Sequence, residues 1–268
     1  MIDLDARPLA VVTGASSGIG RALAAVLADH GDDLVLAAED DGIHRVAEVL
    51  GATGLDVVGV QVDLATPEGV ESLAEHVRAV GRAPEVLCLN AGVGVGGPFV
   101  ESDLDEQLRL IALDVTGVVH LARLLLPSMV DHGFGRVLVT SSIAAVMPGP
   151  WLATYAASKA FLYSFAQALR VELEDTGVRV TALLPGPTDT DFFARAGIED
   201  SRLGQGPKDD PADVAKDAYD ALMAGSDHVV AGSFRNRVQV ATAKVVPDTV
   251  AADLHGAMAA PAEVAADR

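Results

Sequence analysis

The sequence is poor in cysteine and in aromatic residues. A single cysteine, Cys88, occurs among 268 residues, so no disulfide can form within the chain. It lies in the apolar run EVLCLN, where we expect a buried strand residue rather than a nucleophile. Aromatic residues make up 4% of a chain that is 50% hydrophobic, so its core must be built largely from Ala, Val and Leu.

Positive charge is also scarce, because 19 Lys and Arg stand against 38 Asp and Glu, a formal net charge of −19. No basic segment could neutralise phosphates, which argues against a nucleic-acid partner or an anionic membrane surface. No run approaches 18 uninterrupted apolar residues, and the start, MIDLDARP, lacks the apolar region of a signal peptide. The seven histidines show no metal-ligand spacing. We therefore expect a cytoplasmic protein without a metal site.

Short apolar segments alternate with helical segments along most of the chain. We predict strands at residues 9–13, 33–38, 56–64, 85–90, 135–142 and 178–186. A helix is predicted over 67–80, with Thr66 as its N-cap and Pro67 as its first residue, and two helical segments over 101–131. This alternation predicts a doubly wound parallel sheet, the Rossmann fold, as one α/β domain of three layers, α/β/α.

Glycine and polar residues mark the later part of the chain. We expect the Rossmann-type domain to occupy residues 1–232. Within it, 187–211 is a polar, glycine-bearing excursion with two phenylalanines, which we predict to be a lid. Residues 233–268 are expected to form a partly helical C-terminal extension.

The first predicted strand leads directly into TGASSGIG, residues 13–20, and then into a helix. Gly14 permits the turn, Gly18 lets the backbone approach a ligand, and Gly20 allows close packing of helix and strand. The start of the helix offers N–H groups and a positive dipole to a pyrophosphate. The alternative is a glycine-rich turn that binds nothing.

Tyr155 and Lys159 are four residues apart in YAASK, so on a helix they share one face. The pair could be an ordinary surface contact. It could also be an acid/base device, because a free phenol has a pKa near 10 and a nearby cation favours the phenolate. Tyr163 has Gln167 at the same spacing, so we expect it to be structural.

These motifs together carry a family resemblance. TGASSGIG, the NAG of Asn90 to Gly92, Tyr155-x-x-x-Lys159 and the PGPTDT of 185–190 resemble the short-chain dehydrogenase/reductase family over about residues 8–232. The resemblance implies an NAD(P)-dependent oxidoreductase, commonly a homodimer or homotetramer formed through its long helices. It also implies a small-molecule carbonyl or alcohol substrate.

The resemblance assigns roles to individual residues. Tyr155 would exchange the proton, Lys159 would lower the pKa of Tyr155 and hold the nicotinamide ribose, and Ser142 would donate to the substrate oxygen. Ser142 ends a predicted strand, while its neighbour Ser141 should face the other way and be structural. The cofactor-binding residues would be Gly14, Ser16, Ser17, Gly18, Ile19, Gly20, Glu39, Asp63, Asn90, Ala91, Gly92, Tyr155, Lys159, Pro185, Gly186, Thr188 and Thr190.

One position departs from the family pattern. Asp114, in LDVTG, stands where members usually have an Asn that holds a water of a proton relay. We group Asp114 with the catalytic residues and expect retained activity with a shifted pH profile, because a carboxylate would partly cancel the field of Lys159. The alternative is that Asp114 only caps nearby backbone.

The choice of dinucleotide depends on the end of the second strand, LVLAAEDD. Ala38 occupies the position where NAD-preferring members often have Asp, and Glu39 the position where NADP-preferring members often have Arg. Glu39 and Asp40 would repel a 2′-phosphate, so we favour NAD, with NADP possible. Both acids could instead be solvated residues that select nothing.

We predict a neutral, moderately apolar ketone or secondary alcohol as substrate. The expected pocket wall is Gly94 to Pro98, Val146 to Trp151, and Phe192 with Phe193. The phenylalanines could equally pin the lid to the core. Two other functions remain open: an NADPH-dependent 3-oxoacyl reductase, and a dinucleotide-binding sensor without turnover. The sequence leaves substrate, direction and oligomer size undetermined.

Overall fold

Seven parallel strands form one sheet in the computed structural model, which describes residues 7–243 and 246–260. Their order is β3-β2-β1-β4-β5-β6-β7, so the chain reverses direction across the sheet between β1 and β4. The strands are β1 (Leu9–Thr13), β2 (Asp33–Ala38), β3 (Val57–Gln61), β4 (Val86–Leu89), β5 (Gly135–Thr140), β6 (Val178–Pro185) and β7 (His228–Ala231). This is the predicted doubly wound Rossmann fold in a single domain.

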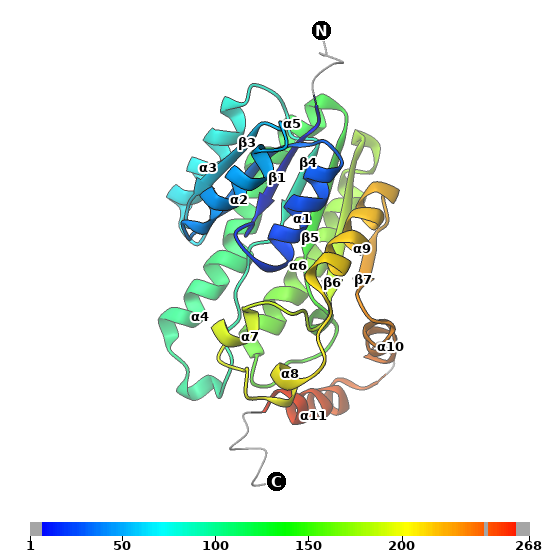
Figure 1. The fold of residues 1–268 in the computed structure, drawn as a ribbon. Helices are drawn as coiled ribbons and strands as arrows, with labels where there is room; N and C mark the ends of the chain where they lie inside the picture. The colour runs from blue at the N-terminus through cyan, green and yellow to red at the C-terminus, as the bar shows by residue number, and fades with distance from the viewer. Residues whose placement is uncertain (1–6, 244–245, 261–268) are drawn as a thin grey trace.

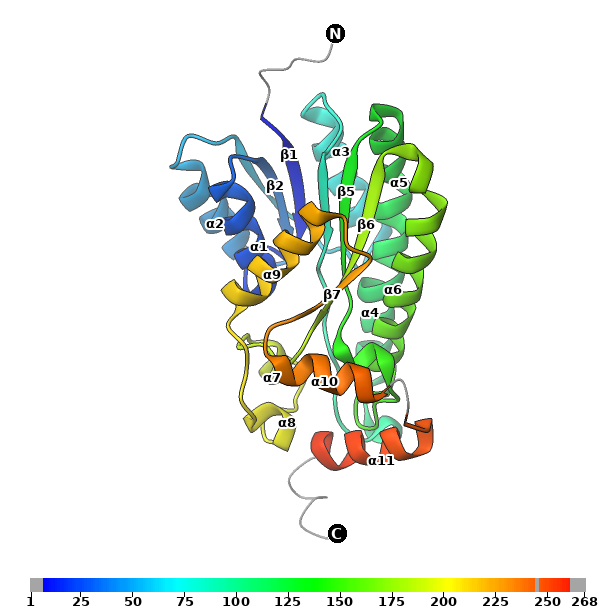
Figure 2. The same ribbon diagram turned by 90° about the vertical axis from the view of Figure 1, so that its right-hand side faces the viewer.

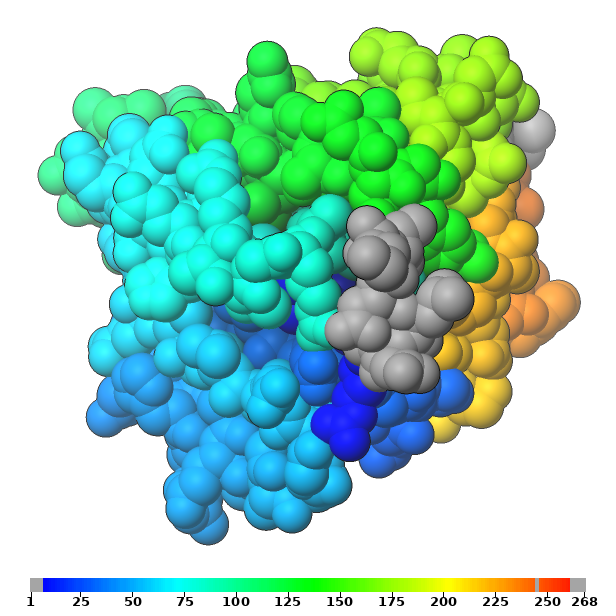
Figure 3. Space-filling view, turned by 90° about the horizontal axis from the view of Figure 1, so that it is seen from above, coloured from blue at the N-terminus to red at the C-terminus, as the bar shows by residue number. Residues whose placement is uncertain are grey.

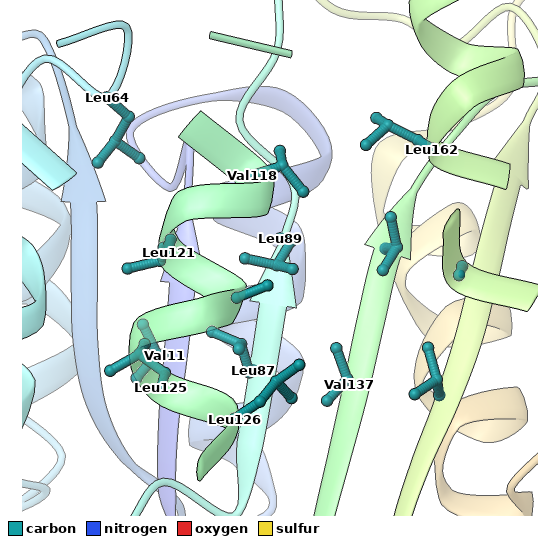
Figure 4. Close-up of a cluster of buried hydrophobic side chains, with 14 of the residues drawn as sticks. Val11, Leu64, Leu87, Leu89, Val118, Leu121, Leu125, Leu126, Val137 and Leu162 are labelled. Carbon is teal, nitrogen blue, oxygen red and sulfur yellow. The ribbon is translucent and has the colours of Figure 1, made fainter. Parts of the chain in front are cut away.

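Alternate side chains of each strand enter two separate hydrophobic cores, as strand geometry requires. Ala10 and Val12 of β1 belong to one core, and Leu9 and Val11 belong to the other. Figure 4 shows the second core, where strand residues such as Leu87 and Val137 meet residues of flanking helices. Because both faces are covered, the central strands β1, β4, β5 and β6 consist mainly of buried apolar residues.

Helices cover both faces of the sheet, and Figure 2 shows the two helical layers on either side of it. One layer holds α1 (Gly18–Asp29), α2 (Gly42–Gly51) and α9 (Pro211–Ala224). The other holds α3 (Pro67–Ala79), α5 (Val118–His132) and α6 (Ala153–Glu172). Thr66 accepts a hydrogen bond from the Gly69 amide and Pro67 opens α3, which confirms the predicted helix start.

A long helical run precedes β5. It begins with α4 (Leu104–Ile111), widens into the π-helical turn η2 (Ala112–Gly117) and continues as α5. The whole run, Leu104–His132, is long and apolar enough to span a membrane by length and composition. One such helix is weak evidence for a membrane span, and this one packs Leu110, Leu121 and Leu125 into the protein core. The π turn places Asp114 toward the interior, where it is completely buried.

Four short helices gather at the end of the molecule where the strands finish (Figure 1). The excursion contributes α7 (Phe192–Arg195) and α8 (Arg202–Gln205), and the C-terminal segment contributes α10 (Phe234–Ala243) and α11 (Asp248–Ala259). Figure 3 looks onto the opposite end, where β1 begins. The fold therefore concentrates its irregular segments at one end.

Some strand limits differ from those predicted. β3 ends at Gln61 rather than at residue 64, because Asp63 turns the chain toward α3 by accepting from the Ala65 amide at 2.9 Å. β5 ends at Thr140, so both Ser141 and Ser142 lie beyond it. β7, which pairs with β6, was not predicted. The boundary at residue 232 remains a prediction.

Candidate active site

A cavity opens at the carboxyl ends of β1, β2, β4, β5 and β6, where ligands bind in folds of this kind. Of the residues predicted to form the site, every one except Asp114 lines this cavity. Asp114 lies directly behind the wall with no exposed surface. The fold thus brings together the predicted residues from seven separate segments.

The glycine-rich loop forms one end of the cavity. Gly14 has a φ of 67°, and a Cβ there would lie 2.9 Å from the Cα of Ala91, so only glycine fits. Ser17 is the N-cap residue of α1 but its side chain makes no capping hydrogen bond. The first N–H groups of α1 are therefore not occupied by a side-chain cap, in contrast to those of α3 and α9.

Asn90 joins the ends of three strands beside this loop. Its amide donates to the backbone oxygen of Thr13 at 3.0 Å, and its Oδ1 accepts from Thr140 at 3.1 Å. The Thr13 hydroxyl in turn accepts from the backbone amides of Asn90 and Ala91. These bonds hold β1, β4 and β5 together at the cavity floor.

Ser142 and Tyr155 meet in the middle of the cavity. Ser142 follows β5 and is the N-cap of a short 3₁₀ turn, where its hydroxyl accepts from the Ala144 amide at 3.1 Å. Tyr155 lies in the first turn of α6, and its phenol is hydrogen-bonded with Ser142. The ring packs against Phe192 of the excursion, with centroids 5.0 Å apart.

Lys159 and Asp114 form a buried ion pair behind these two hydroxyls. Nζ of Lys159 lies 3.1 Å from Oδ2 of Asp114, and the side chains are 5% and 0% exposed. Asp114 also accepts from the Val93 amide at 2.9 Å and from the Ser158 hydroxyl at 3.3 Å. Asp114 thus contacts Val93, Ser158 and Lys159, all outside its own helical turn. The alternative that it only caps nearby backbone does not include these contacts.

Opposing effects act on the Tyr155 phenol. Burial raises its pKa, and the positive charge of Lys159 and the hydrogen bond with Ser142 lower it. The Asp114 carboxylate raises the pKa again, and the balance lies above the ordinary value. Burial lowers the pKa of Lys159, but the Asp114 carboxylate and Tyr155 together raise it, and the balance lies above the ordinary value, so Lys159 is an ammonium at neutral pH.

The adenosine end of the cavity holds a charge network that the sequence did not reveal. Arg109 of α4 donates to Asp63 through Nη1 at 2.8 Å and to Glu39 through Nη2 at 2.6 Å. The hydrogen bond with Arg109 is the main reason that the pKa of Asp63 lies below its usual value. Asp40 instead accepts from Ser16 at 2.7 Å and from the Gly42 amide at 3.1 Å.

The excursion is closed at its base. Thr188 and Asp209 form an isolated parallel bridge, and the side chain of Asp209 accepts from Asn236 of α10 at 2.7 Å. Thr190 reaches the glycine-rich loop, because a Cβ on Gly18 would lie 3.0 Å from its methyl group. The two ends of the excursion are thus fixed beside the cavity.

The observed pocket wall differs in part from the predicted one. Gly94, Phe192 and Phe193 line the cavity, but residues 95–98 and 146–151 do not. Leu152, which follows the second of these segments, does line it. Trp151 has a φ of 68°, rare for a residue with a side chain, and its carbonyl accepts from the Gly97 amide. Segment 146–151 therefore supports the wall from behind.

Sequence reasoning missed a group of cavity residues on the later helices. They are Leu203 of α8, Gln239 of α10, and His255 and Met258 of α11. His255 is buried, which lowers its pKa. No motif marks these residues, and only their packing against the excursion brings them to the site.

Three residues that we expected to be structural, Ser141, Tyr163 and Cys88, make contacts within the protein. Ser141 donates to the backbone oxygen of Lys159 at 2.7 Å, which fixes α6 against β5. Tyr163 packs edge-on against His228, with ring centroids 6.1 Å apart. Cys88 is buried in β4, and burial raises the pKa of its thiol to about 12.

The cavity fits a dinucleotide. The glycine turn and the uncapped start of α1 provide backbone donors for a pyrophosphate, and the Asp63 end and the Tyr155 end lie on either side of them. Lys159 and the pair of hydroxyls supply proton chemistry at one end only. Fold and site together define a dinucleotide-dependent oxidoreductase.

Comparison with known proteins gives the family. Residues 8–200 match the short chain dehydrogenase family, and the chain belongs to it. The 1-deoxy-11-beta-hydroxypentalenate dehydrogenase of Streptomyces avermitilis is 41% identical over 225 residues, 81% of each chain. The protein is therefore an NAD(P)-dependent dehydrogenase or reductase.

Solved structures agree on the fold. A short-chain dehydrogenase from Sphingobium yanoikuyae in complex with NADPH is 31% identical, with a TM-score of 0.78 over 83% of this chain and 87% of its own. One from Burkholderia phymatum in complex with NAD is 28% identical, with a TM-score of 0.79 over 91% and 94%. These two relatives contain different dinucleotides.

Proposed function

We propose that the protein transfers hydride between NAD(H) and a neutral, moderately apolar ketone or secondary alcohol. The observation that carries this proposal is the position of Tyr155, hydrogen-bonded with Ser142 and backed by the charged side chain of Lys159. The apolar residues Leu152, Phe192 and Met258 line the cavity beside them. The name of the Streptomyces avermitilis relative, a dehydrogenase of a hydroxylated carboxylate, supports an alcohol substrate but does not support the neutral charge that we propose.

In this proposal each side chain has a separate task. Ser142 donates to the substrate oxygen, and the Tyr155 phenolate accepts the hydroxyl proton when an alcohol is oxidised. Lys159 stabilises the phenolate by its charge, and Asp114 holds Lys159 in place. A bound nicotinamide supplies the hydride acceptor or donor. Asn90, Thr190 and the glycine-rich loop would hold the dinucleotide.

NAD(H) is the preferred coenzyme in this proposal. Ala38, Ser16 and Ser17 offer no positive charge to a 2′-phosphate, and Glu39 and Asp40 lie on the same side of the cavity. A ribose 2′-hydroxyl can instead donate to the Glu39 carboxylate. Dissociation constants for NADH and NADPH, measured by calorimetry, test the preference, and tighter binding of NADPH would refute it.

Turnover with a graded set of substrates tests the reaction itself. Cyclic and acyclic secondary alcohols and their ketones are incubated with oxidised or reduced dinucleotide, and the nicotinamide absorbance is followed. We expect turnover to rise with the apolar size of the substrate. Turnover confined to thioester-linked 3-oxoacyl substrates would favour a 3-oxoacyl reductase. Coenzyme binding without turnover of any tested compound would favour a sensor.

We further propose that the protein is a cytoplasmic homodimer or homotetramer. Leu104, Leu108 and Ile111 lie exposed along α4, and Phe161 and Val171 along α6, so two long helices present apolar side chains to solvent. A second copy of the chain would cover them. Light scattering after size exclusion should show an oligomer that Leu108→Asp dissociates. Val49→Asp, on the equally exposed Val49 of α2, is the control.

A further inference from the structure

Arg109 joins the two carboxylates that face the adenosine end of the cavity. It donates to both oxygens of Asp63, at 2.8 and 3.1 Å, and to Oε2 of Glu39 at 2.6 Å. Glu39 follows β2 and Asp63 follows β3, while Arg109 comes from α4. A single guanidinium therefore spans the gap between two neighbouring strand ends.

The three side chains remain accessible to a ligand. Arg109 is 45% exposed, Glu39 54% and Asp63 36%. Among the described residues that line the cavity, the basic ones are Lys159 and Arg195, and both lie toward the Tyr155 end. Arg109 does not itself line the cavity, but it is bonded to the two carboxylates, Glu39 and Asp63, that line the adenosine end.

The contacts of Arg109 with its two carboxylate partners differ in strength. Its contact with Asp63 is bidentate, and Asp63 is itself fixed by the Ala65 amide at 2.9 Å. Its contact with Glu39 uses Nη2 alone, and the Glu39 side chain is the most exposed of the three. The Glu39 contact is the one that a competing anion can replace.

We propose that Arg109 determines coenzyme selectivity, by exchanging the Glu39 carboxylate for the 2′-phosphate of NADP(H). With NAD(H), Arg109 stays on Glu39 and Asp63, and Glu39 accepts from the ribose 2′-hydroxyl. With NADP(H), Nη2 of Arg109 pairs with the phosphate while Nη1 keeps its bond to Asp63. The inference rests on the proposed hydride-transfer function and would allow an acidic strand end to bind either dinucleotide.

Calorimetric dissociation constants of NADH and NADPH, without substrate, test this on the full chain. The variants are Arg109→Gln, Glu39→Gln and the double variant. Arg78→Gln serves as the control, because Arg78 is an exposed arginine near the end of α3. This helix runs back toward the amino-terminal ends of the strands, away from the cavity. Thermal unfolding of each variant confirms that it is folded.

The expected results form a double-mutant cycle. Arg109→Gln weakens NADPH binding about tenfold and NADH binding less than about threefold. Glu39→Gln strengthens NADPH binding about tenfold, because Nη2 is released to the phosphate. In the Arg109→Gln background, the Glu39→Gln substitution should strengthen NADPH binding by less than about threefold.

Two outcomes would overturn the inference. One is that Arg109→Gln weakens the binding of NADH and NADPH equally, which is what a purely structural link between α4 and the strand ends would give. The other is an undiminished gain from Glu39→Gln when Arg109 is absent. Either result, obtained while NADH still supports turnover, leaves the proposed function intact. Failure of the wild-type protein and of Arg78→Gln to bind either dinucleotide would instead count against the proposed function.

Discussion

Lys159 and Asp114 form an ion pair of 3.1 Å in which neither partner is more than 5% exposed. The pair joins α6 to the π-helical turn between α4 and α5. Gly92 packs against the pair, because a Cβ there would lie 2.9 Å from Nζ of Lys159 and 3.1 Å from Oδ1 of Asp114. The arrangement fixes the ammonium behind Tyr155, and its negative partner limits how far that ammonium can lower the pKa of the phenol.

Replacing Asp114 with Asn tests this balance. Because the Asp114 charge raises the pKa of Tyr155, its removal should lower that pKa. The rise of kcat/KM for alcohol oxidation with pH should then move to lower pH. The Asn side chain can still accept from the Val93 amide, so the fold should be kept. Profiles that superimpose would show that Asp114 has no influence on the proton transfer.

Removing the phenol tests the proposed proton transfer directly. Tyr155→Phe should lower kcat by about 10³-fold, within the range typical of a lost general acid or base. The dissociation constant of NADH should change by less than about threefold, because the ring is retained. Tyr163→Phe is the matched control on the same helix and should leave kcat unchanged. Comparable losses in both variants would contradict the assignment.

Asp32 should make stability depend on pH. It is 6% exposed at the start of β2, and burial, followed by the charge of Glu85, raises its pKa from 3.8 to about 6. The contribution of protonated Asp32 to the free energy of unfolding is fully present below pH 3.8, and it is lost as the pH rises through about 6. The shift corresponds to about 3 kcal/mol at most.

Asp32→Asn should therefore stabilise the protein at neutral pH. We expect its Tm to exceed that of the wild type by roughly 5 °C at pH near 7.5 and to match it near pH 4, where Asp32 is protonated. Thermal unfolding at both pH values provides the comparison. A stabilisation that is the same at both values would mean that the charge of Asp32 is not its cause.

Cys88 should be unreactive in the folded protein. It is fully buried in β4, and its thiol has a pKa of about 12, so almost no thiolate exists at neutral pH. A chromogenic disulfide reagent should release no colour from the native chain and one equivalent after unfolding in guanidinium. Rapid reaction without unfolding would indicate that β4 opens locally.

The fold and the centre of the site followed from short-range patterns. The strand and helix alternation, the glycine turn around Gly14 and the spacing of Tyr155 and Lys159 are local signals, and parallel pairing brings the strand ends together.

Long-range contacts could not be predicted in the same way. Arg109 meets Glu39 across 70 residues and Asp63 across 46, and no local spacing marks either pair. The π-helical turn that buries Asp114 likewise has no sequence pattern of its own. His255 and Met258 reach the cavity from the last helix, where apolar periodicity is weak, so their contribution depends on packing alone.

The placement of α11 has a practical consequence for handling the protein. His255 and Met258 line the cavity four residues and one residue before α11 ends at Ala259, whereas β1 begins at the opposite end of the molecule (Figure 1). An affinity tag, a fusion partner or a surface linker attached after α11 would therefore sit beside the cavity that we propose to be the active site. Attachment ahead of β1 keeps that cavity clear, which makes it the preferred design for immobilised or fused forms.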